Sequence, residues 1–437
     1  MSFPRYPKYK ASGVEWLGDV PEHWNVLPCR SIVQERTTKN DDAKCQDYLS
    51  LMANVGVIPY AEKGDIGNKK PEDLSKCKIV TRGDFVINSM NYGIGSYGLS
   101  DYDGVCSSVY IVLKPKNYIV ESRFAFRIFE SRSFQKFAQS FGNGILEHRS
   151  AINWDILKSI GVGIPSLDEQ KSVLEFLDRE TGKIDELVAE QRRLMELLKE
   201  KRQAVISHAV TKGLNPHAPM KPSGIEWLGD VPKHWGVWKL THAFEKIGSG
   251  TTPKTDNREY YDDGTHPWVN TGDLNDGDLT DCEKKITDLA LSDHTTLRIY
   301  PAGSVVIAMY GATIGKLAIL RFPASVNQAC CVFSGRLTIE YKFLFFWLLA
   351  YRPQIISLAS GGGQPNVNQD ILRGLRVACP ALAEQITIIE FLEAESSKFD
   401  TLTAEAQRAI DLLQERRTAL ISAAVTGQID VRQQARN

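Results

Sequence analysis

The sequence lacks the features that mark a membrane protein or a secreted protein. No apolar run reaches the roughly 18 residues that a membrane-spanning helix needs, and residues 1–10 lack the apolar core of a signal peptide. The 8 cysteines include no CxxC pair, so neither a disulfide framework nor a metal site is predicted. These absences favour a cytoplasmic protein whose thiols are reduced.

A strong net charge is also missing. The 437 residues carry a formal charge of −1, which by itself does not indicate nucleic-acid binding. The charges are unevenly distributed, however. The two large middle segments are neutral to slightly basic, and the two shorter helical segments are acidic. A balanced total therefore does not exclude a DNA-binding protein, because separate parts can carry opposite charge.

An internal repeat organises the chain. Residues 12–24 read SGVEWLGDVPEHW and residues 223–235 read SGIEWLGDVPKHW, so that eleven of thirteen positions are identical. Residues 164–211 likewise resemble residues 379–426. Their shared positions pair Glu169 with Glu384, Gln170 with Gln385, Asp185 with Asp400, and Arg202 with Arg417. The chain is therefore predicted to contain two tandem halves.

Each half is predicted to contain a two-tryptophan motif, a long variable middle and a helical tail. The expected boundaries are a globular part at 1–163, a helical part at 164–214, a globular part at 215–378 and a helical part at 379–437. His23 and His234 each precede a tryptophan of the motif, and we interpret them as structural; a shared catalytic histidine is the alternative. Similar frames with different middles suggest two similar tasks on two different targets.

Both tails are predicted to be long helices that pair as an antiparallel coiled coil. Ser166 and Glu169 fit a capping box at the start of the first helix. Apolar positions then alternate at spacings of three and four, the pattern of a coiled-coil seam. The expected seam residues are Ile184, Leu187, Gln191, Leu194, Leu198, Lys201 and Val205, and Phe399, Leu402, Ala406, Ala409, Leu413, Arg416 and Leu420. About 25 residues would form a spacer of roughly 38 Å; packing of each helix on its own domain alone is the alternative.

The two middles are predicted to share a mixed α/β (α+β) fold with many short strands. Strands are expected around Ile79–Val80, Phe85–Ile87 and Val109–Leu113 in the first half. The second half has corresponding strands at Val305–Met309, Leu317–Leu320 and Ala329–Phe333. Helices are expected near Ser122–Ser140 and Glu340–Ala350. The whole is thus predicted to be two globular domains separated by a pair of long helices, with an internal pseudo-two-fold repeat.

The loops of both middles carry amide, basic and aromatic residues. Arginine and lysine suit guanine edges, asparagine and glutamine suit adenine, and glycines let the backbone approach phosphate. The candidate DNA-binding residues of the first half are Asn88, Asn91, Tyr92, His148 and Arg149. Those of the second half are Thr251, Thr252, Lys254, Tyr310, Lys316, Asn327, Gln328 and Gln364. Ordinary polar turns are the alternative for each of them.

No catalytic set is predicted. Gly311–Lys316 resembles a phosphate-binding loop, but only three residues separate its glycines and Leu317 follows the lysine. Asp278 with Glu283–Lys285 only superficially resembles a nuclease cluster. Two other classes of function stay open at this point: a self-contained DNA-modifying enzyme, and a coiled-coil scaffold without DNA readout.

Taken together, these motifs resemble the specificity subunit of type I restriction–modification systems. The resemblance rests on the doubled two-tryptophan motif and on the tails, which share P-x-L-x-EQ, FL-(D/E)-x-E and Arg-x-Ala…Ile-Ser…Ala-Val-Thr. Gly248–Pro253, Trp268–Leu274 and Ser325–Ala329 resemble parts of a target recognition domain. The first middle departs from this pattern, because it lacks the Gly-Thr-Pro segment.

The resemblance implies a DNA-reading subunit that performs no chemistry. Each target recognition domain would read one half of a bipartite site in double-stranded DNA, and the helices would set the spacing. Two methyltransferase subunits would dock on the helices and bring S-adenosylmethionine, while restriction subunits would bring ATP and magnesium. We expect no cofactor on this chain. The exposed charges of Arg192, Arg193, Glu196 and Glu200 are candidate contacts to the methyltransferase, with a solvated helix face as the alternative.

Overall fold

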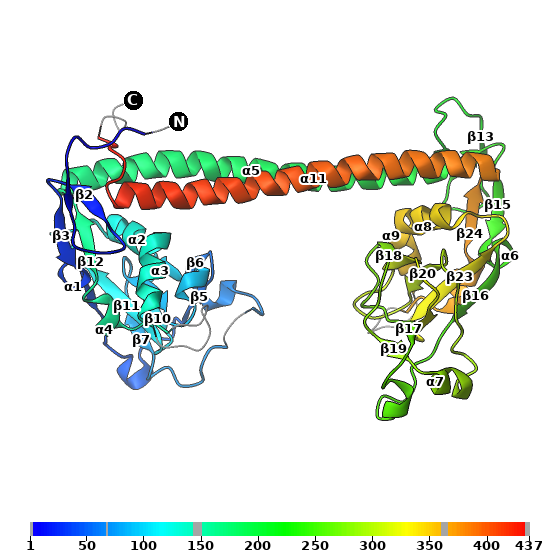
Figure 1. Cartoon of the computed structure of the whole chain (residues 1–437), viewed down its shortest axis with the longest axis horizontal. Coiled ribbons are helices and arrows are strands. Elements are labelled where there is room, and N and C mark those ends of the chain that lie inside the picture. The colour runs from blue at the N-terminus through cyan, green and yellow to red at the C-terminus, as the bar shows by residue number, and fades with distance from the viewer. Residues whose placement is uncertain (1–2, 67–68, 143–150, 360–365, 433–437) are drawn as a thin grey trace. The chain divides into compact units, whose positions relative to one another are not determined.

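The chain forms two compact units. The structure, a computed structural model, describes residues 3–66, 69–142, 151–359 and 366–432. Unit 1 contains Met1–Arg192 and Gln407–Asn437, and unit 2 contains Arg193–Ala406. Each unit therefore combines one globular half with one end of each long helix (Figure 1). Among the helices of the described part, none is long and apolar enough to cross a membrane.

The core of unit 1 is an antiparallel sheet in the order β4-β11-β8-β9. Its strands are β4 (Val33–Glu35), β8 (Phe85–Asn88), β9 (Tyr97–Leu99) and β11 (Tyr110–Pro115), which confirms the strands expected near Phe85 and Val109. The helical region predicted near Ser122–Ser140 consists of two helices, α2 (Ser122–Glu130) and α3 (Arg132–Ser140). They separate at Ser131, whose ψ of 125° is extended. The rings of Phe85 and Phe129 lie 5.1 Å apart and attach α2 to the sheet.

Short ladders and helices complete unit 1. The ladders are β1 (Tyr9–Ala11) with β2 (Asp19–Pro21), β3 (Asn25–Pro28) with β12 (Gly161–Ile164), β5 (Leu49–Met52) with β6 (Gly56–Pro59), and β7 (Lys78–Val80) with β10 (Gly104–Cys106). The short helices are α1 (Cys29–Ile32) and α4 (Trp154–Leu157), with single 3₁₀ turns at Asp41–Ala43, Tyr60–Glu62 and Tyr92–Ile94. The β3–β12 ladder brings the chain back beside the two-tryptophan motif before the long helix begins.

Unit 2 contains the same antiparallel arrangement of four strands and a fifth strand that runs parallel to its neighbour, in the order β16-β23-β20-β21-β18. The strands are β16 (Phe244–Ser249), β18 (Gly277–Leu279), β20 (Val305–Ala308), β21 (Leu317–Leu320) and β23 (Cys330–Arg336). The three strands predicted in this half are therefore confirmed as β20, β21 and β23. The predicted helix is α8 (Tyr341–Ala350), whose Phe343 and Trp347 are fully buried in the core.

Two of the remaining ladders of unit 2 have counterparts in unit 1. The ladders are β13 (Met220–Pro222) with β14 (Asp230–Pro232), β15 (Gly236–Lys239) with β24 (Arg376–Cys379), and β17 (His266–Val269) with β19 (Lys285–Ile286) and β22 (Ser325–Val326). The short helices are α6 (Leu240–Ala243), α7 (Asp288–Asp293), α9 (Arg352–Ser357) and α10 (Gln369–Gly374), with a 3₁₀ turn at Arg258–Tyr260. The β13–β14 and β15–β24 ladders are the counterparts of β1–β2 and β3–β12.

In unit 1 the two-tryptophan motif closes onto the first turn of a long helix. The Ser166 hydroxyl accepts a hydrogen bond from the Glu169 amide over 3.3 Å, which is one half of the predicted capping box. The Glu169 carboxylate does not form the other half. It accepts hydrogen bonds from Tyr6 Oη (2.7 Å) and Trp24 Nε1 (3.0 Å), and it lies 2.8 Å from His23 Nε2. Burial and the bond to Glu169 raise the pKa of the Tyr6 phenol. His23 thus belongs to a structural joint.

The second half builds the same joint around Glu384. Its carboxylate accepts a hydrogen bond from Trp235 Nε1 over 3.1 Å and lies 2.8 Å from His234 Nε2. The position before this helix is Ala381, so no side-chain hydroxyl caps the first turn. The polar joint is therefore common to both halves, while the hydroxyl cap belongs to the first half.

A buried glutamine follows each of these glutamates. Gln170 and Gln385 are both fully buried, and the amide of each makes three hydrogen bonds to the backbone. The partners of Gln170 are the Ile119 and Pro165 carbonyls and the Glu121 amide. The partners of Gln385 are the Thr338 and Pro380 carbonyls and the Glu340 amide. Each glutamine ties the helix start to the segment before α2 or α8, because a buried amide must satisfy its donors and acceptor.

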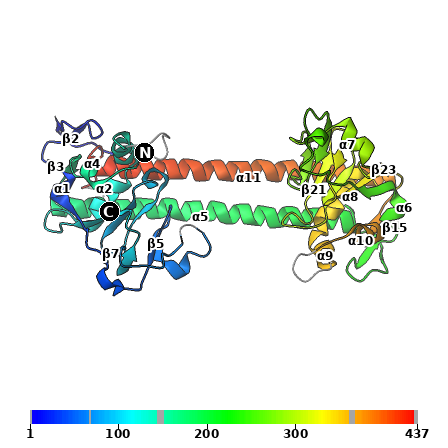
Figure 2. The ribbon, with the colours of Figure 1, turned by 90° about the horizontal axis from the view of Figure 1, so that it is seen from below.

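The long helices α5 (Leu167–Lys212) and α11 (Leu382–Val425) pack together as the predicted antiparallel pair. In unit 1 the first part of α5 lies beside the last part of α11 in both views (Figures 1 and 2). Asp185 Oδ1 accepts from Arg417 Nε over 3.0 Å, and Asp400 Oδ1 accepts from Arg202 Nη1 over 2.6 Å. The internal repeat relates these two ion pairs to each other, as in a contact between two copies of one surface.

The predicted seam is right at some positions and wrong at others. Ile184, Leu198, Phe399, Ala406 and Leu420 are buried as expected. Leu187, Leu194 and Leu402 are instead more than two-fifths exposed, and Lys201 and Arg416 are also exposed. The inward positions are held one residue further on, by Val188, Met195, Arg202, Thr403 and Arg417. Each helix has two neighbouring rows of side chains with the same spacing of three and four residues. The row that contains these leucines was predicted to face the other helix, but it is the exposed row.

Candidate nucleic-acid interface

Three loops of unit 2 meet at one edge of its main sheet. They are the residues after β16, the turn between β20 and β21, and the residues before β23. Gly250 N donates to the Asn327 carbonyl over 3.4 Å, and Met309 N donates to the Ala329 carbonyl over 2.7 Å. The fold thus brings these predicted residues onto neighbouring loops: Thr251, Thr252, Lys254, Tyr310, Lys316, Asn327 and Gln328.

Side-chain amides and hydroxyls cross-link this edge. The Thr252 hydroxyl donates to the Gln328 side-chain carbonyl. Asn327 Nδ2 donates to Asn270 Oδ1 over 3.3 Å, and the buried Trp268 indole donates to the Thr251 carbonyl over 3.2 Å. The sequence analysis did not assign Asn270 to the site, although it lies inside the family-like segment Trp268–Leu274. The edge therefore presents amide donors and acceptors of the type that can read base edges.

Two lysines of this edge are available to contact an anion. Lys254 and Lys316 are exposed, and neither forms an ion pair with another described residue. The carboxylate of Asp276, beside the β20–β21 turn, is neutralised by Arg352 through contacts of 2.5 and 3.1 Å. Lysines without an ion-pair partner, next to side-chain amides, are expected on a surface that contacts a phosphate backbone.

Unit 1 presents the corresponding edge of its own sheet. The loop after β8 contacts the residues before β11, because Ser89 Oγ donates to the Val109 carbonyl over 3.3 Å. The Ser89 carbonyl accepts from Ile152 N over 3.1 Å, so the segment that leads to α4 joins the same edge. Met90 and Val109 are each 60% exposed there. These two apolar side chains were missed by the sequence analysis, which considered only polar and aromatic residues.

The predicted residues of this first edge differ in their exposure. Asn88 is mostly buried, and its side-chain oxygen accepts from Met90 N over 3.1 Å, while Asn91 is partly exposed. Tyr92 is fully buried and its hydroxyl donates to the Phe129 carbonyl over 2.5 Å. Its side chain therefore supports the loop from inside and does not reach the surface. His148, Arg149 and Gln364 lie outside the described residues.

The residues near these edges have structural rather than chemical roles. Gly311 and Gly315 adopt φ values of 81° and 78°, which the tight β20–β21 turn requires and which explain the resemblance to a phosphate loop. Asp278 forms an ion pair with Arg321 over 2.7 Å, so it is not free to act with Glu283–Lys285. Burial raises the pKa of the Cys331 thiol to about 12. Within the described part of the chain, no group of three His, Cys, Asp or Glu side chains could hold a metal ion.

The helical surfaces carry the second set of predicted residues. Arg192, Arg193, Glu196 and Glu200 are all exposed on α5. Both helices also expose leucines that were not predicted to lie on the surface: Leu187 (44%), Leu197 (52%), Leu402 (44%) and Leu412 (65%). The repeat equates Leu187 with Leu402 and Leu197 with Leu412, so each of these leucines is exposed in both copies. Exposed apolar side chains repeated in this way mark a candidate protein-binding surface.

Comparison with known proteins gives a consistent result. The family described as "Type I restriction modification DNA specificity domain" matches residues 21–194 and 232–411. The type I restriction enzyme MjaVIII specificity subunit of Methanocaldococcus jannaschii is 24% identical over 428 residues, which are 94% of each chain. Among solved structures, a chain from work on complex assembly and conformational transition of the type I R-M system has a TM-score of 0.69 at 15% identity, covering 93% of this chain and 98% of that one. The HsdS subunit from Thermoanaerobacter tengcongensis has a TM-score of 0.50 at 16% identity over the same shares.

Proposed function

Because the chain belongs to the family of type I restriction–modification DNA specificity domains, we propose that it reads the two halves of a bipartite DNA sequence for partner enzymes. The observation that carries the proposal is the equivalence of the two loop edges. Two similar frames present the same edge of the same kind of sheet, with different side chains on each. Residues 1–163 and 215–378 act as the two target recognition domains, and residues 164–214 and 379–437 act as the helical spacers.

Each edge reads its half-site in the major groove of double-stranded DNA. The amides of unit 2 suit adenine edges, and its two free lysines suit guanine or phosphate. Met90 and Val109 of unit 1 can contact the methyl group of thymine. The proposed contacts of unit 1 are Asn88, Asn91, His148 and Arg149, with Tyr92 supporting their loop. Those of unit 2 are Thr251, Thr252, Lys254, Tyr310, Lys316, Asn327, Gln328 and Gln364.

The helix pair docks two methyltransferase subunits. Each unit exposes one repeat-related leucine from each helix: Leu187 and Leu412 in unit 1, Leu402 and Leu197 in unit 2. Two equivalent apolar patches fit two copies of one partner. Arg192, Arg193, Glu196 and Glu200 then form a charged rim near the partner. The methyltransferases supply S-adenosylmethionine, restriction subunits supply ATP and magnesium, and the assembly acts on cytoplasmic DNA.

Methylome sequencing tests the reading function. The chain is expressed with its methyltransferase subunit in a host free of adenine methylation, and modified adenines are mapped across the genome. The expected result is a new motif in two parts separated by unspecified bases. If a soluble complex of both subunits produces no new motif, the reading function is wrong and a scaffold role remains.

A pair of helix variants tests the docking surface. Leu197→Asp with Leu412→Asp removes one leucine from each patch, and we expect capture of the methyltransferase to fall by at least about tenfold, the equivalent of roughly 1.4 kcal/mol. The matched variant reverses the charges of Arg193 and Glu196 and should weaken capture less, because rim charges contribute little. Equal capture by the leucine variant and the parent chain would show that the methyltransferase binds elsewhere.

A further inference from the structure

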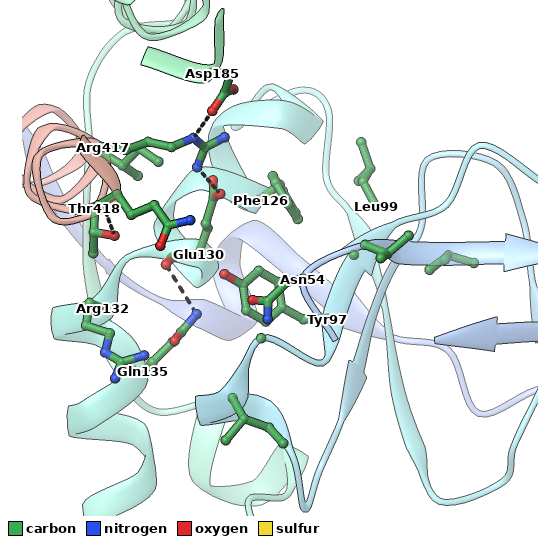
Figure 3. A pocket seen from close by; sticks show the side chains of 18 of the residues that line it. Asn54, Tyr97, Leu99, Phe126, Glu130, Arg132, Gln135, Asp185, Arg417 and Thr418 are labelled. Atoms are coloured by element: carbon green, nitrogen blue, oxygen red, sulfur yellow. Dashed lines mark hydrogen bonds and ion pairs between the residues drawn. The ribbon is translucent and has the colours of Figure 1, made fainter. Parts of the chain in front are cut away.

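Arg417 of α11 joins three elements of unit 1 through one side chain. Its Nε donates to Asp185 of α5 over 3.0 Å, and its Nη1 donates to Glu130 at the end of α2 over 3.2 Å (Figure 3). Only 13% of the Glu130 side chain and 29% of the Arg417 side chain are exposed. Glu130 also accepts from Arg127 over 2.6 Å, which fixes the carboxylate. The ion pair is therefore partly desolvated and held in place from both sides.

A cavity of about 1150 Å³ adjoins this arginine. It separates the β5–β6 hairpin and β9 of the recognition domain from the helix pair (Figure 3). Its charged lining residues balance: they are Asp101, Glu130 and Asp185, and Arg132, Arg192 and Arg417. The cavity thus offers no excess charge to an ionic ligand. Beside the cavity, two polar contacts join the end of α2 to α11. They are the Arg417–Glu130 ion pair and a 3.0 Å contact between the Ser131 and Ser422 hydroxyls.

Unit 2 has no corresponding bridge between the described residues. The repeat equates Arg417 with Arg202, which pairs with Asp400 of the other long helix over 2.6 Å. At the end of α8, where α2 carries Glu130, the chain has Ala350, whose carbonyl accepts from Gln203 Nε2 over 3.3 Å. At this position the first half has a domain-to-helix ion pair and the second half has a neutral hydrogen bond. A second domain-to-helix ion pair is common to both halves, as Arg123 with Asp178 and Lys342 with Glu393.

We propose that Arg417 is a positioning residue that fixes the orientation of the first target recognition domain on the helix pair, and thereby the spacing of half-sites that the chain accepts. The inference rests on the proposed DNA-reading function. One extra base pair moves a half-site by about 3.4 Å and turns it by roughly 35° about the DNA axis. A rigidly held domain rejects such a site, whereas a loosened domain can follow it.

The test compares spacer selectivity. The motif of the parent chain is placed on plasmids with the spacer lengthened or shortened by one base pair, and methylation is measured relative to the parental spacing. For Arg417→Ala we expect this preference to fall by about tenfold, the effect of losing roughly 1.4 kcal/mol of orientation energy. The matched control Arg202→Ala removes the repeat-related arginine, whose ion pair is with Asp400 of the other long helix, and should keep the preference within about twofold.

A conservative exchange separates positioning from simple stabilisation. The variant Arg417→Lys keeps a positive charge beside Glu130 and Asp185. We expect it to retain most of the spacer preference that Arg417→Ala loses. If Arg417→Ala retains the parental preference, the inference is wrong. If Arg417→Ala yields no assembled complex, the variant Glu130→Gln replaces it in the test, because this variant leaves the Arg417–Asp185 contact in place. A reduced spacer preference in Glu130→Gln supports the inference, and an unchanged spacer preference overturns it.

A second readout requires no DNA and so separates this inference from the proposed function. Hydrogen exchange of the isolated chain reports how firmly α2 and α3 are held. Arg417→Ala should speed exchange of the amides in residues 122–140, and Arg202→Ala should not. Unchanged exchange in Arg417→Ala would overturn the inference even if the parent chain reads a bipartite motif. Faster exchange would support the positioning role even if no motif were found.

Discussion

The two joints between recognition domain and helix are built from the same residues but sealed to different degrees. Glu169 in unit 1 has 7% of its side chain exposed, whereas its counterpart Glu384 in unit 2 has 37% exposed. The difference comes from Tyr6 and Arg432, which lie beside the first joint. Tyr6 donates to Glu169, and the Arg432 guanidinium lies 4.8 Å from the centre of the Tyr6 ring. A repeat can therefore reproduce a polar joint while its burial depends on segments outside the repeat.

The largest difference between the halves is expected from removing these glutamates. Glu169→Ala leaves a buried hydroxyl and a buried indole without an acceptor, and should reduce the free energy of unfolding by about 2–4 kcal/mol. Glu384→Ala should cost about 1–2 kcal/mol, because it leaves one buried donor, the Trp235 indole, and an imidazole of His234 that water can reach. Urea unfolding followed by tryptophan fluorescence measures both. Equal losses would contradict the difference in burial on which the comparison rests.

Removing the buried glutamines should destabilise the two halves equally. Gln170 and Gln385 are equally buried and make equivalent hydrogen bonds, so alanine at either position should cost about 2–3 kcal/mol. Calorimetry of the two variants side by side measures the ratio. A loss in one variant that is less than half the loss in the other would show that the frames are not energetically equivalent.

Smaller and again equal effects are expected at two helix caps. The Asn153 side chain accepts from Ile156 N over 3.0 Å, and the Asn368 side chain accepts from Ile371 N over 2.9 Å. Alanine at either cap should cost about 1 kcal/mol. Denaturation midpoints at constant slope provide the measurement. If alanine leaves the free energy of unfolding unchanged in one half, water replaces the asparagine as the hydrogen-bond acceptor at that helix start.

Thiol labelling should distinguish the halves without changing their stability. Cys45 of the first half is partly exposed, whereas the other seven cysteines are buried. Burial raises the pKa of Cys106 and of Cys379 to about 12, so these thiols stay protonated and unreactive at pH 8. We expect one fast-reacting thiol per native chain and eight after unfolding. A fast-reacting thiol in the second half would show that its core opens readily.

The sequence was sufficient to predict the features that depend on local pattern. The repeat, the strands such as β20 and β21, and the two long helices follow from periodicity and from identity between the halves. Features that depend on distant partners could not be predicted. The buried Tyr92 donates a hydrogen bond to Phe129, which is 37 positions away in the sequence. Arg417 forms an ion pair with Glu130, which is 287 positions away. The seam failed for a related reason, since periodicity does not show which of two apolar stripes finds the other helix.

The central claim is that the two halves share one scaffold and recognise DNA independently. Its most direct test is a chain in which residues 25–163 are replaced by residues 236–378. This chain carries the second recognition segment twice and keeps both two-tryptophan motifs and both helices. Methylome sequencing of its complex with the methyltransferase should reveal a motif that contains the second half-site twice and lacks the first. Retention of the first half-site, or an assembled complex that methylates no motif, would contradict the account.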